Sequence, residues 1–262
     1  MTQTRILQLS DLHLFADPDE RLKGIPTRDL LRSVVTRIQL SGVALDHVVV
    51  TGDQAHDDLT ATYEAVREIL RPWLDRLWLL PGNHDERAVM RSVFPDRIAG
   101  EGSERIDFAF RAGDWLCLGL DTQVTGEVLG RIDADQIEWI RQQLRANQPQ
   151  GAVLFMHHPP VTIGCAWLDR IGLEGKGLLH DLLLADERIR LVCCGHVHHE
   201  SAQRVGAAEV VTTPSTGLQF SATSDIPLFV QAPPGYRIVE LDDGRFSTRV
   251  VRLPEARYPP EQ

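Results

Sequence analysis

The stretch Leu77–Asp85, LWLLPGNHD, is an apolar run that ends abruptly in a polar turn containing glycine. The same pattern recurs along the chain, and each run fits a strand that is buried on both faces. The further runs are RILQLSDLH (Arg5–His13), HVVVTGD (His47–Asp53), DWLCLGLDT (Asp114–Thr122), AVLFMHHPP (Ala152–Pro160) and IRLVCCGHVH (Ile189–His198).

Helical patterns alternate with these runs. Apolar residues recur at helical spacing in three stretches, and the second begins with a capping-box pair, Asp133 and Gln136. Alternating β and α elements predict an α/β fold in which helices cover a parallel or mixed sheet. The three apolar faces are Leu30, Leu31, Val34, Val35 and Ile38; Ile137, Ile140 and Leu144; and Leu178, Leu179, Leu182 and Leu183.

The C-terminal part has a different pattern. EVVTTPS (209–215), GYRIVEL (235–241) and RFSTRVVRL (245–253) indicate successive strands, which predict a second sheet of mostly antiparallel character. We expect a single domain over residues 1–262, with a surface loop at about 226–236 and a frayed tail at 254–262.

Composition narrows the function classes. At 262 residues and 43% hydrophobic, the chain can bury a large core, and its net charge of −10 argues against a broad nucleic-acid surface. The sequence contains neither a signal-peptide pattern nor an uninterrupted apolar segment long enough to span a membrane. The four cysteines have no CxxC spacing and are expected to be buried small hydrophobes. We therefore expect a cytoplasmic protein.

Polar side chains follow five of the apolar runs, at the point where each run ends. In α/β sheets, sites form outside the carboxyl ends of the strands, so we expect these side chains at one sheet edge. Glycines beside them would let the chain turn sharply there. The side chains are Asp11 and His13; Asp53; Asn83 and His84; His157 and His158; and His196 and His198.

This set has the chemistry of a metal site. On an extended segment, residues i and i+2 point to the same side, so Asp11 with His13, and His196 with His198, can each hold one ion. Carboxylate, imidazole and amide ligands suit Mn, Fe, Co or Zn better than Ca. There are more ligands than one ion needs, and Asp53 can bridge, which favours two ions roughly 3.5–4 Å apart.

Each motif alone is weak, but the ordered set D-x-H, GD, GNHD, His before Pro and GH-x-H resembles the calcineurin-like metallophosphoesterases. The resemblance implies a four-layer αββα sandwich, with two facing mixed sheets flanked by helices. Further stretches resemble the bacterial class III 3′,5′-cyclic-AMP phosphodiesterases of that superfamily. They are ILQLSDLHLFA (6–16), GCAWLD (164–169), CGHVHHE (194–200), TPSTGLQF (213–220) and PPGYR (233–237).

The resemblance also implies roles for the ligand set. Asp11, His13 and His198 would hold the first metal, Asn83, His157 and His196 would hold the second, and Asp53 would bridge both. The resemblance thus assigns His196 and His198 to different ions of the pair, although both face the same site. His84 is the candidate catalytic residue, which would contact the phosphate and assist the departing alkoxide. The implied substrate-binding residues are His13, Asp53, Asn83, His84 and His198.

The implied reaction is hydrolysis of 3′,5′-cyclic AMP to 5′-AMP by a metal-bridging hydroxide. The alternative is a broader phosphodiesterase on the same site, acting on 2′,3′-cyclic nucleotides or glycerophosphodiesters, and a non-catalytic scaffold is the least favoured hypothesis. Two divalent or trivalent ions would be bound, with Fe and/or Mn favoured and Zn or Co as alternatives. The expected partner is a cyclic nucleotide rather than nucleic acid or a membrane, and a homodimer is left open.

Some residues near these motifs are left unassigned. His157 and His158 are adjacent and their side chains diverge, so one of them is expected to bind metal, and the resemblance favours His157. Substrate contact by His158, His56 or His199 stays open. Asp169 in GCAWLD fits either a contact with the base or ribose or a turn.

Overall fold

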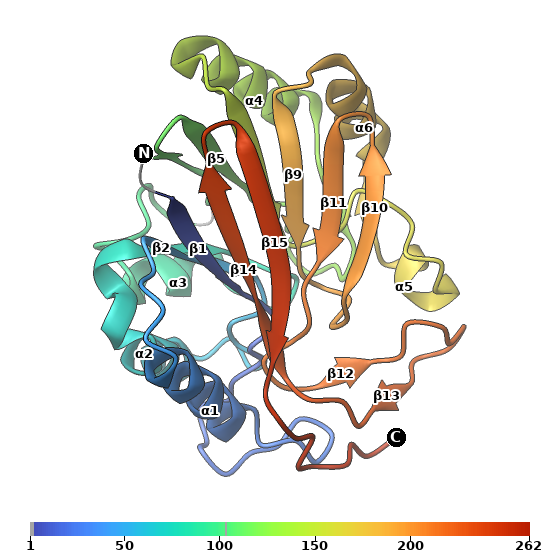
Figure 1. Cartoon of the computed structure of the whole chain (residues 1–262). Coiled ribbons are helices and arrows are strands. Elements are labelled where there is room, and N and C mark those ends of the chain that lie inside the picture. Colours follow the sequence, from blue (N-terminus) through green and yellow to red (C-terminus); the bar gives the residue numbers. More distant parts are fainter. Residues whose placement is uncertain (1–2, 103) are drawn as a thin grey trace.

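The computed structural model describes residues 3–102 and 104–262, and its chain folds as two facing sheets between helices (Figure 1). The first sheet has the strand order β15-β14-β1-β2-β3, and the second has the order β10-β11-β9-β7-β5-β4. The first comprises β1 (Thr4–Leu9), β2 (His47–Thr51), β3 (Leu77–Leu80), β14 (Gly235–Asp242) and β15 (Arg245–Arg252). The second comprises β4 (Phe108–Ala112), β5 (Trp115–Leu120), β7 (Gly151–Met156), β9 (Ile189–Cys194), β10 (Ser201–Val205) and β11 (Ala208–Thr212).

Helices cover the outer face of each sheet. The first sheet packs against α1 (Thr27–Leu40), α2 (Thr60–Ile69), the 3-10 helix η1 (Arg71–Arg76) and α3 (Arg87–Val93). The second packs against α4 (Ala134–Asn147) and α6 (Lys176–Ala185), while the short α5 (Ala166–Arg170) lies near the strand ends. Short strands form two further pairs, β6 (Gly130–Arg131) with β8 (Leu173–Glu174), and β12 (Gln219–Phe220) with β13 (Phe229–Val230).

Three layers of apolar side chains hold these elements together. The middle layer lies between the sheets and joins Ile6 and Val49 of the first sheet to Val153, Phe155 and Cys193 of the second. Because both faces of the central strands are covered, their sequences are continuous apolar runs. The expected four-layer αββα architecture is therefore confirmed.

The expectation of a separate antiparallel sheet in the C-terminal part is wrong. β14 pairs antiparallel with β1, and β15 extends the same edge, so both complete the first sheet. β11 pairs parallel with β9 in the second sheet. Apolar patterning identifies these segments as strands, but it carries no information on which existing edge each strand joins. Within 226–236, β13 and the start of β14 replace part of the expected loop.

Local signals explain where α4 begins. The Asp133 carboxylate caps the helix by accepting from the Gln136 backbone N–H at 3.0 Å. The Gln136 side chain, which a capping box would return to the cap residue, donates instead to the backbone carbonyl of Asp121 at 2.8 Å. The cap is therefore one-sided, and the Gln136 side chain ties α4 to the end of β5.

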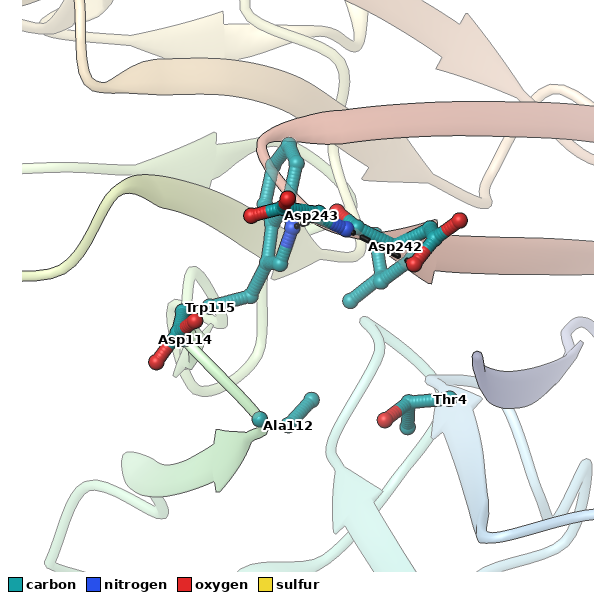
Figure 2. Close-up of a pocket in the computed structure, with 8 residues that line it drawn as sticks. Thr4, Ala112, Asp114, Trp115, Asp242 and Asp243 are labelled. Atoms are coloured by element: carbon teal, nitrogen blue, oxygen red, sulfur yellow. Dashed lines mark hydrogen bonds between the residues drawn. The ribbon is translucent and has the colours of Figure 1, made fainter. Parts of the chain in front are cut away.

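The amino ends of β1 and β5 and the β14–β15 hairpin line a common cavity, whose residues include Thr4, Trp115, Asp242 and Asp243 (Figure 2). The Trp115 indole N–H donates to the backbone carbonyl of Asp242 at 2.9 Å, beside this cavity of about 250 Å³. This cavity lies at the opposite ends of these strands from the predicted ligands. None of the helices in the described ranges combines the length and the apolar character that a membrane crossing requires.

Candidate metal centre

Three of the five loops that carry the predicted ligands leave their strands through left-handed backbone conformations. The extended backbone expected for Asp11 with His13 and for His196 with His198 is therefore wrong, although the side chains do meet. Such conformations cost about 1–3 kcal/mol each in L-residues and persist only where the surroundings enforce them. The left-handed ligand residues are Asp11 (φ 55°), His13 (φ 46°), Asp53 (φ 53°), His196 (φ 69°) and His198 (φ 50°).

Backbone hydrogen bonds join the loop after β1, which carries Asp11 and His13, to the loop after β2, which carries Asp53. The N–H of Asp11 donates to the carbonyl of Gly52 at 3.1 Å, and the N–H of His13 donates to the carbonyl of Asp53 at 2.9 Å. Gly52 has a φ of +98°, and a Cβ there would lie 2.7 Å from Cγ of His157. Glycine is therefore required at this position by both backbone angle and space.

Four buried side chains form the first cluster, namely Asp11, His13, Asp53 and His198, each of which offers a ligand atom within 4.8 Å of the others. Nε2 of His13 lies 3.1 Å from Nε2 of His198 and 3.4 Å from Oδ2 of Asp53. Nε2 of His198 lies 3.4 Å from Oδ1 of Asp11. The predicted first-metal residues and the predicted bridge thus lie together.

The second cluster lies beside the first. Oδ1 of Asn83 is 3.2 Å from Nε2 of His157 and 3.1 Å from Nδ1 of His196. Nε2 of His157 is also 3.4 Å from Oδ2 of Asp53, so this carboxylate adjoins both clusters. His158 is close in space, but its Nδ1 contacts Oγ1 of Thr122 at 2.8 Å and its Nε2 contacts the carbonyl of Val128 at 3.1 Å. Both of its nitrogens are therefore occupied.

The hydrogen bonds of three imidazoles fit a bound cation. Nδ1 of His157 faces the carbonyl of Thr51 at 2.7 Å, Nδ1 of His198 faces the carbonyl of Leu218 at 2.8 Å, and Nε2 of His196 faces the carbonyl of Ile171 at 2.9 Å. A carbonyl can only accept, so each of these nitrogens carries the proton, and in a neutral ring the opposite nitrogen presents its lone pair. Those lone pairs face carboxylate and amide oxygens, which are also acceptors. A metal ion bound among these acceptors would stabilise the arrangement.

Burial and neighbouring charges shift the pKa values of the histidines in these clusters in opposite directions. Burial works to lower the pKa of His157, but the charges of Asp53 and Asp11 outweigh it and raise that pKa to about 9. Burial works to raise the pKa of Asp53, but His157 and His13 hold it well below its usual range. Burial, followed by the charge of His157, lowers the pKa of His196 to about 3, which keeps this ring a neutral donor of its lone pair.

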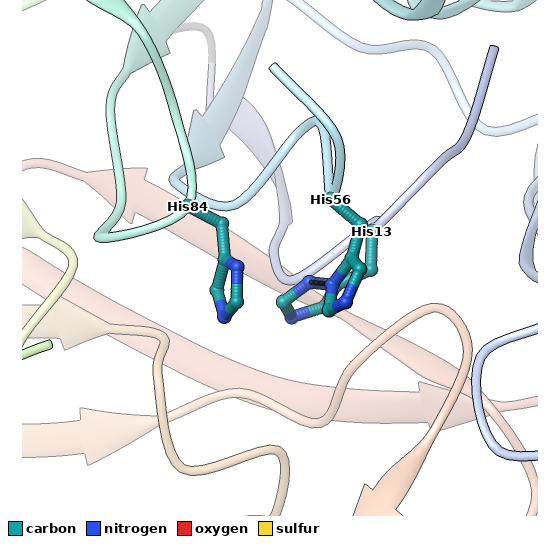
Figure 3. Close-up of side chains that lie close together, drawn as sticks. All are labelled: His13, His56 and His84. Carbon is teal, nitrogen blue, oxygen red and sulfur yellow. Dashed lines mark hydrogen bonds between the residues drawn. The ribbon is translucent and has the colours of Figure 1, made fainter.

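His84 and His56 lie on the open side of the first cluster, and Figure 3 shows their rings with that of His13. The His84 backbone N–H donates to Oδ1 of Asp53 at 2.9 Å, while its ring stacks on His56 with centroids 4.7 Å apart. Nδ1 of His56 is 3.3 Å from Nδ1 of His13. His56 therefore lines the same cavity as His84, a position that the sequence left open. His199 is buried, and neither of its ring nitrogens has a partner within the described ranges.

Asp85, the last residue of GNHD, is a further residue of the site that was not predicted from the sequence. Its buried carboxylate accepts from the backbone N–H of Gly82 at 2.8 Å, from that of Gln54 at 3.0 Å and from the hydroxyl of Tyr63 at 3.2 Å. These bonds tie the loop that carries Asn83 to the loop that carries Asp53. The available signal was that Asp85 is ionisable and directly follows Asn83 and His84.

A cavity of about 310 Å³ opens onto both clusters. One part of its lining is polar and includes five of the seven predicted ligands, whereas the other part is mostly apolar and aromatic. The polar lining residues are His13, Asp53, His56, Asn83, His84, His196 and His198. The remaining lining residues are Leu22, Lys23, Val128, Trp167, Ile171, Leu218, Phe220 and Phe229.

The chain is similar to known proteins both in sequence and in fold. The family model described as calcineurin-like phosphoesterase matches residues 4–200. A 3′,5′-cyclic adenosine monophosphate phosphodiesterase, CpdA, of Pseudomonas aeruginosa is 34% identical over 97% of this chain and 91% of its own. The protein of that name in Escherichia coli K12 is 33% identical over 99% and 93%. A dimetal phosphatase of Danio rerio has a similar fold, with a TM-score of 0.62, 15% identity and coverage of 95% and 98%.

Proposed function

The chain belongs to the calcineurin-like phosphoesterase family, and we propose that it hydrolyses 3′,5′-cyclic AMP to 5′-AMP. The observation that carries the proposal is that the seven predicted ligands form two adjoining clusters, and that five of them line one cavity, in a chain that matches cyclic-AMP phosphodiesterases over almost its whole length. The cavity volume of about 310 Å³ is at the lower end of the range of small-molecule sites, about 300–1,000 Å³.

The site is a two-metal site, and its division between the ions is part of the proposal. Asp11, His13 and His198 would hold one ion, and Asp53 would be shared. Asn83, His157 and His196 would hold the other ion, which the lone-pair directions of His157 and His196 support. The bound ions would activate water near neutral pH and neutralise charge on the phosphate. Fe and/or Mn are proposed, with Zn or Co as alternatives.

His84 is proposed as the catalytic residue that assists the leaving group. Its backbone holds Asp53, while its half-buried ring lines the cavity 4.9 Å from the ring of His13. In the reaction, a water oxygen bonds to phosphorus, the bond between phosphorus and the 3′-oxygen breaks, and that oxygen takes up a proton. A positioned imidazole that donates this proton contributes about 10²–10⁴ in rate.

Substrate comparison tests the proposal. We expect kcat/KM for 3′,5′-cyclic AMP to exceed that for 2′,3′-cyclic AMP and for glycerophosphocholine. Efficient cleavage of either alternative beside negligible turnover of 3′,5′-cyclic AMP would instead support the broader phosphodiesterase. Absence of bound transition metal and of any diesterase activity after Mn²⁺ addition would support the scaffold hypothesis.

The identity of the metal ions, the cellular location of the protein and its oligomeric state are predictions, and each has its own test. Elemental analysis of protein purified without added metal is expected to give two ions per chain, with Fe and/or Mn predominant. Cell fractionation tests the expected cytoplasmic location. Light scattering on the metal-loaded protein distinguishes a monomer from the homodimer that the sequence left open.

A further inference from the structure

The GCAWLD motif and the β12–β13 hairpin contribute no predicted metal ligand, yet they build the apolar side of the catalytic cavity. Trp167 comes from α5 in that motif, and Phe220 and Phe229 face each other across the hairpin. We propose that these three rings form a subsite that stacks the purine base of the nucleotide. This proposal rests on the proposed function for the identity of the phosphate-bearing substrate.

The aromatic rings continue directly from the metal centre. The Phe220 ring lies against the imidazole of His198, with centroids 3.9 Å apart and planes 5° from parallel. Trp167 meets the other rings through Phe220, with centroids 5.1 Å apart and planes at 62°. The side chains of His198, Trp167, Phe220 and Phe229 all line one cavity. A ligand that places its phosphate among the histidines can therefore reach the aromatic rings.

Local hydrogen bonds hold these aromatic residues in place before any ligand binds. The Asp169 carboxylate accepts from the backbone N–H groups of Ile163 at 2.6 Å and Gly164 at 3.1 Å, which fixes the turn before α5. The Cys165 thiol donates to the carbonyl of Ser224 at 2.7 Å, which joins α5 to the loop of the β12–β13 hairpin. Asp169 is thus a turn residue, which resolves the alternative that its sequence position left open.

Charge at this subsite also suits a nucleobase. Among the described residues that line the cavity, Lys23 is the one lysine or arginine, and its Nζ lies 5.4 Å from the centroid of the Phe229 ring. An ammonium group offers donors only, and purine ring nitrogens are acceptors. Aromatic residues stack on any base, and a purine presents the larger face. An aliphatic alcohol of a glycerophosphodiester would gain no stacking here.

Binding of the product 5′-AMP and of ribose 5-phosphate, which lacks the base, tests the subsite. Titration calorimetry with the metal-loaded protein compares 5′-AMP with ribose 5-phosphate. We expect 5′-AMP to bind about tenfold or more tightly, since stacking on a protein aromatic ring contributes roughly five- to hundredfold per base. Trp167→Ala and Phe229→Leu are each expected to reduce this ratio by about fivefold or more.

Matched controls separate stacking from general damage. Trp139→Ala and Phe246→Ala remove half-buried aromatic residues far from the cavity and should leave the ratio within about twofold of wild type. A wild-type ratio below about twofold would overturn the proposal. So would equal weakening of both ligands in Trp167→Ala and Phe229→Leu, because that result would indicate a structural role only.

Turnover distinguishes this proposal from the proposed function. The same variants are assayed with 3′,5′-cyclic AMP and with glycerophosphocholine, a diester without a base or any aromatic ring. The subsite predicts that the ratio of the two kcat/KM values falls about tenfold in Trp167→Ala. A wild-type protein that shows base-dependent binding but no cyclic-AMP cleavage would refute the reaction and leave the subsite standing. Cyclic-AMP cleavage with unchanged ratios would refute the subsite alone.

Discussion

Asp53 joins the two halves of the metal centre, because its Oδ2 lies 3.4 Å from Nε2 of His13 and 3.4 Å from Nε2 of His157. Asp53→Ala removes a ligand shared by both proposed ions. We expect the metal content to fall from two ions per chain to one or fewer, with loss of diesterase activity. Elemental analysis after desalting measures the first effect, and Asp181→Ala, an exposed aspartate on α6, is the control. Two retained ions would show that Asp53 is not a bridge.

His84 separates substrate contact from metal binding. Its contribution to Asp53 is a backbone N–H bond, which His84→Ala preserves, so both ions should remain. The lost imidazole should lower kcat about 10²–10⁴-fold. Metal analysis together with steady-state kinetics distinguishes the two effects, and His180→Ala on α6 removes a histidine outside the cavity as a control. Loss of metal from His84→Ala would contradict the assignment.

At the level of elements, one buried ion pair joins the GNHD loop to the second sheet. Arg87 begins α3 directly after this loop, and its Nε and Nη2 contact the two carboxylate oxygens of Asp121 at 2.6 and 2.8 Å. Nη2 also donates to the carbonyl of Gln123 at 2.8 Å. Both side chains are almost fully buried, with 8% and 0% of their surface exposed. The loop between α3 and β3 is therefore fixed against the end of β5.

Arg87→Ala leaves the Asp121 carboxylate buried without its cation. Removal of one partner of a buried pair costs about 3–5 kcal/mol of unfolding free energy. We expect a fall in Tm of about 6–20 °C for a chain of this size, measured by calorimetry. Arg131→Ala breaks the exposed Arg131–Glu174 pair, in which both side chains are more than half exposed, and should change Tm little. Similar Tm losses in both variants would refute the role of burial.

At the scale of the whole molecule, the sequence predicted the central strands closely. Val48 to Val50 and Leu191 to Cys194 are buried on both faces, and such segments need continuous apolar sequence. The edge strands were less predictable, because β14 pairs with β1 although more than 200 residues separate the two strands in the sequence. Apolar pattern is local, whereas the choice of a sheet edge depends on all the other strands.

The candidate metal centre also combines features that local sequence predicts with features that depend on the folded chain. The residue types of Asp11, Asn83 and His196 and their places after apolar runs are local signals, and the structure brings them together. The left-handed backbone of Asp11 could not be predicted, since it depends on a hydrogen bond to Gly52 in another loop. The role of Asp85 in joining two loops is equally a property of the folded molecule.

The stability of the whole chain should depend on pH through Asp107, which directly precedes β4 and contacts Gln136 of α4. Its Oδ1 accepts from the backbone N–H of Asp121 at 2.8 Å and from the Gln136 side chain at 3.2 Å. Burial raises the pKa of Asp107 to about 6, despite the favourable Asp121 N–H bond. An unfolded aspartate has a pKa of about 3.9, so the folded state binds more protons between these values.

The free energy of unfolding should therefore fall as pH rises from about 4 to about 6, and this contribution should then level off. Asp107→Asn keeps an oxygen for both hydrogen bonds and removes the charge. It should raise the unfolding free energy at pH 7 by about 1–2 kcal/mol, below the limit of about 3 kcal/mol for two pKa units because the group is partly exposed. Denaturant titrations should show a smaller gain at pH 5 than at pH 7. Asp243→Asn in the exposed β14–β15 turn should show neither gain, and equal gains for Asp107→Asn at both pH values would contradict the raised pKa.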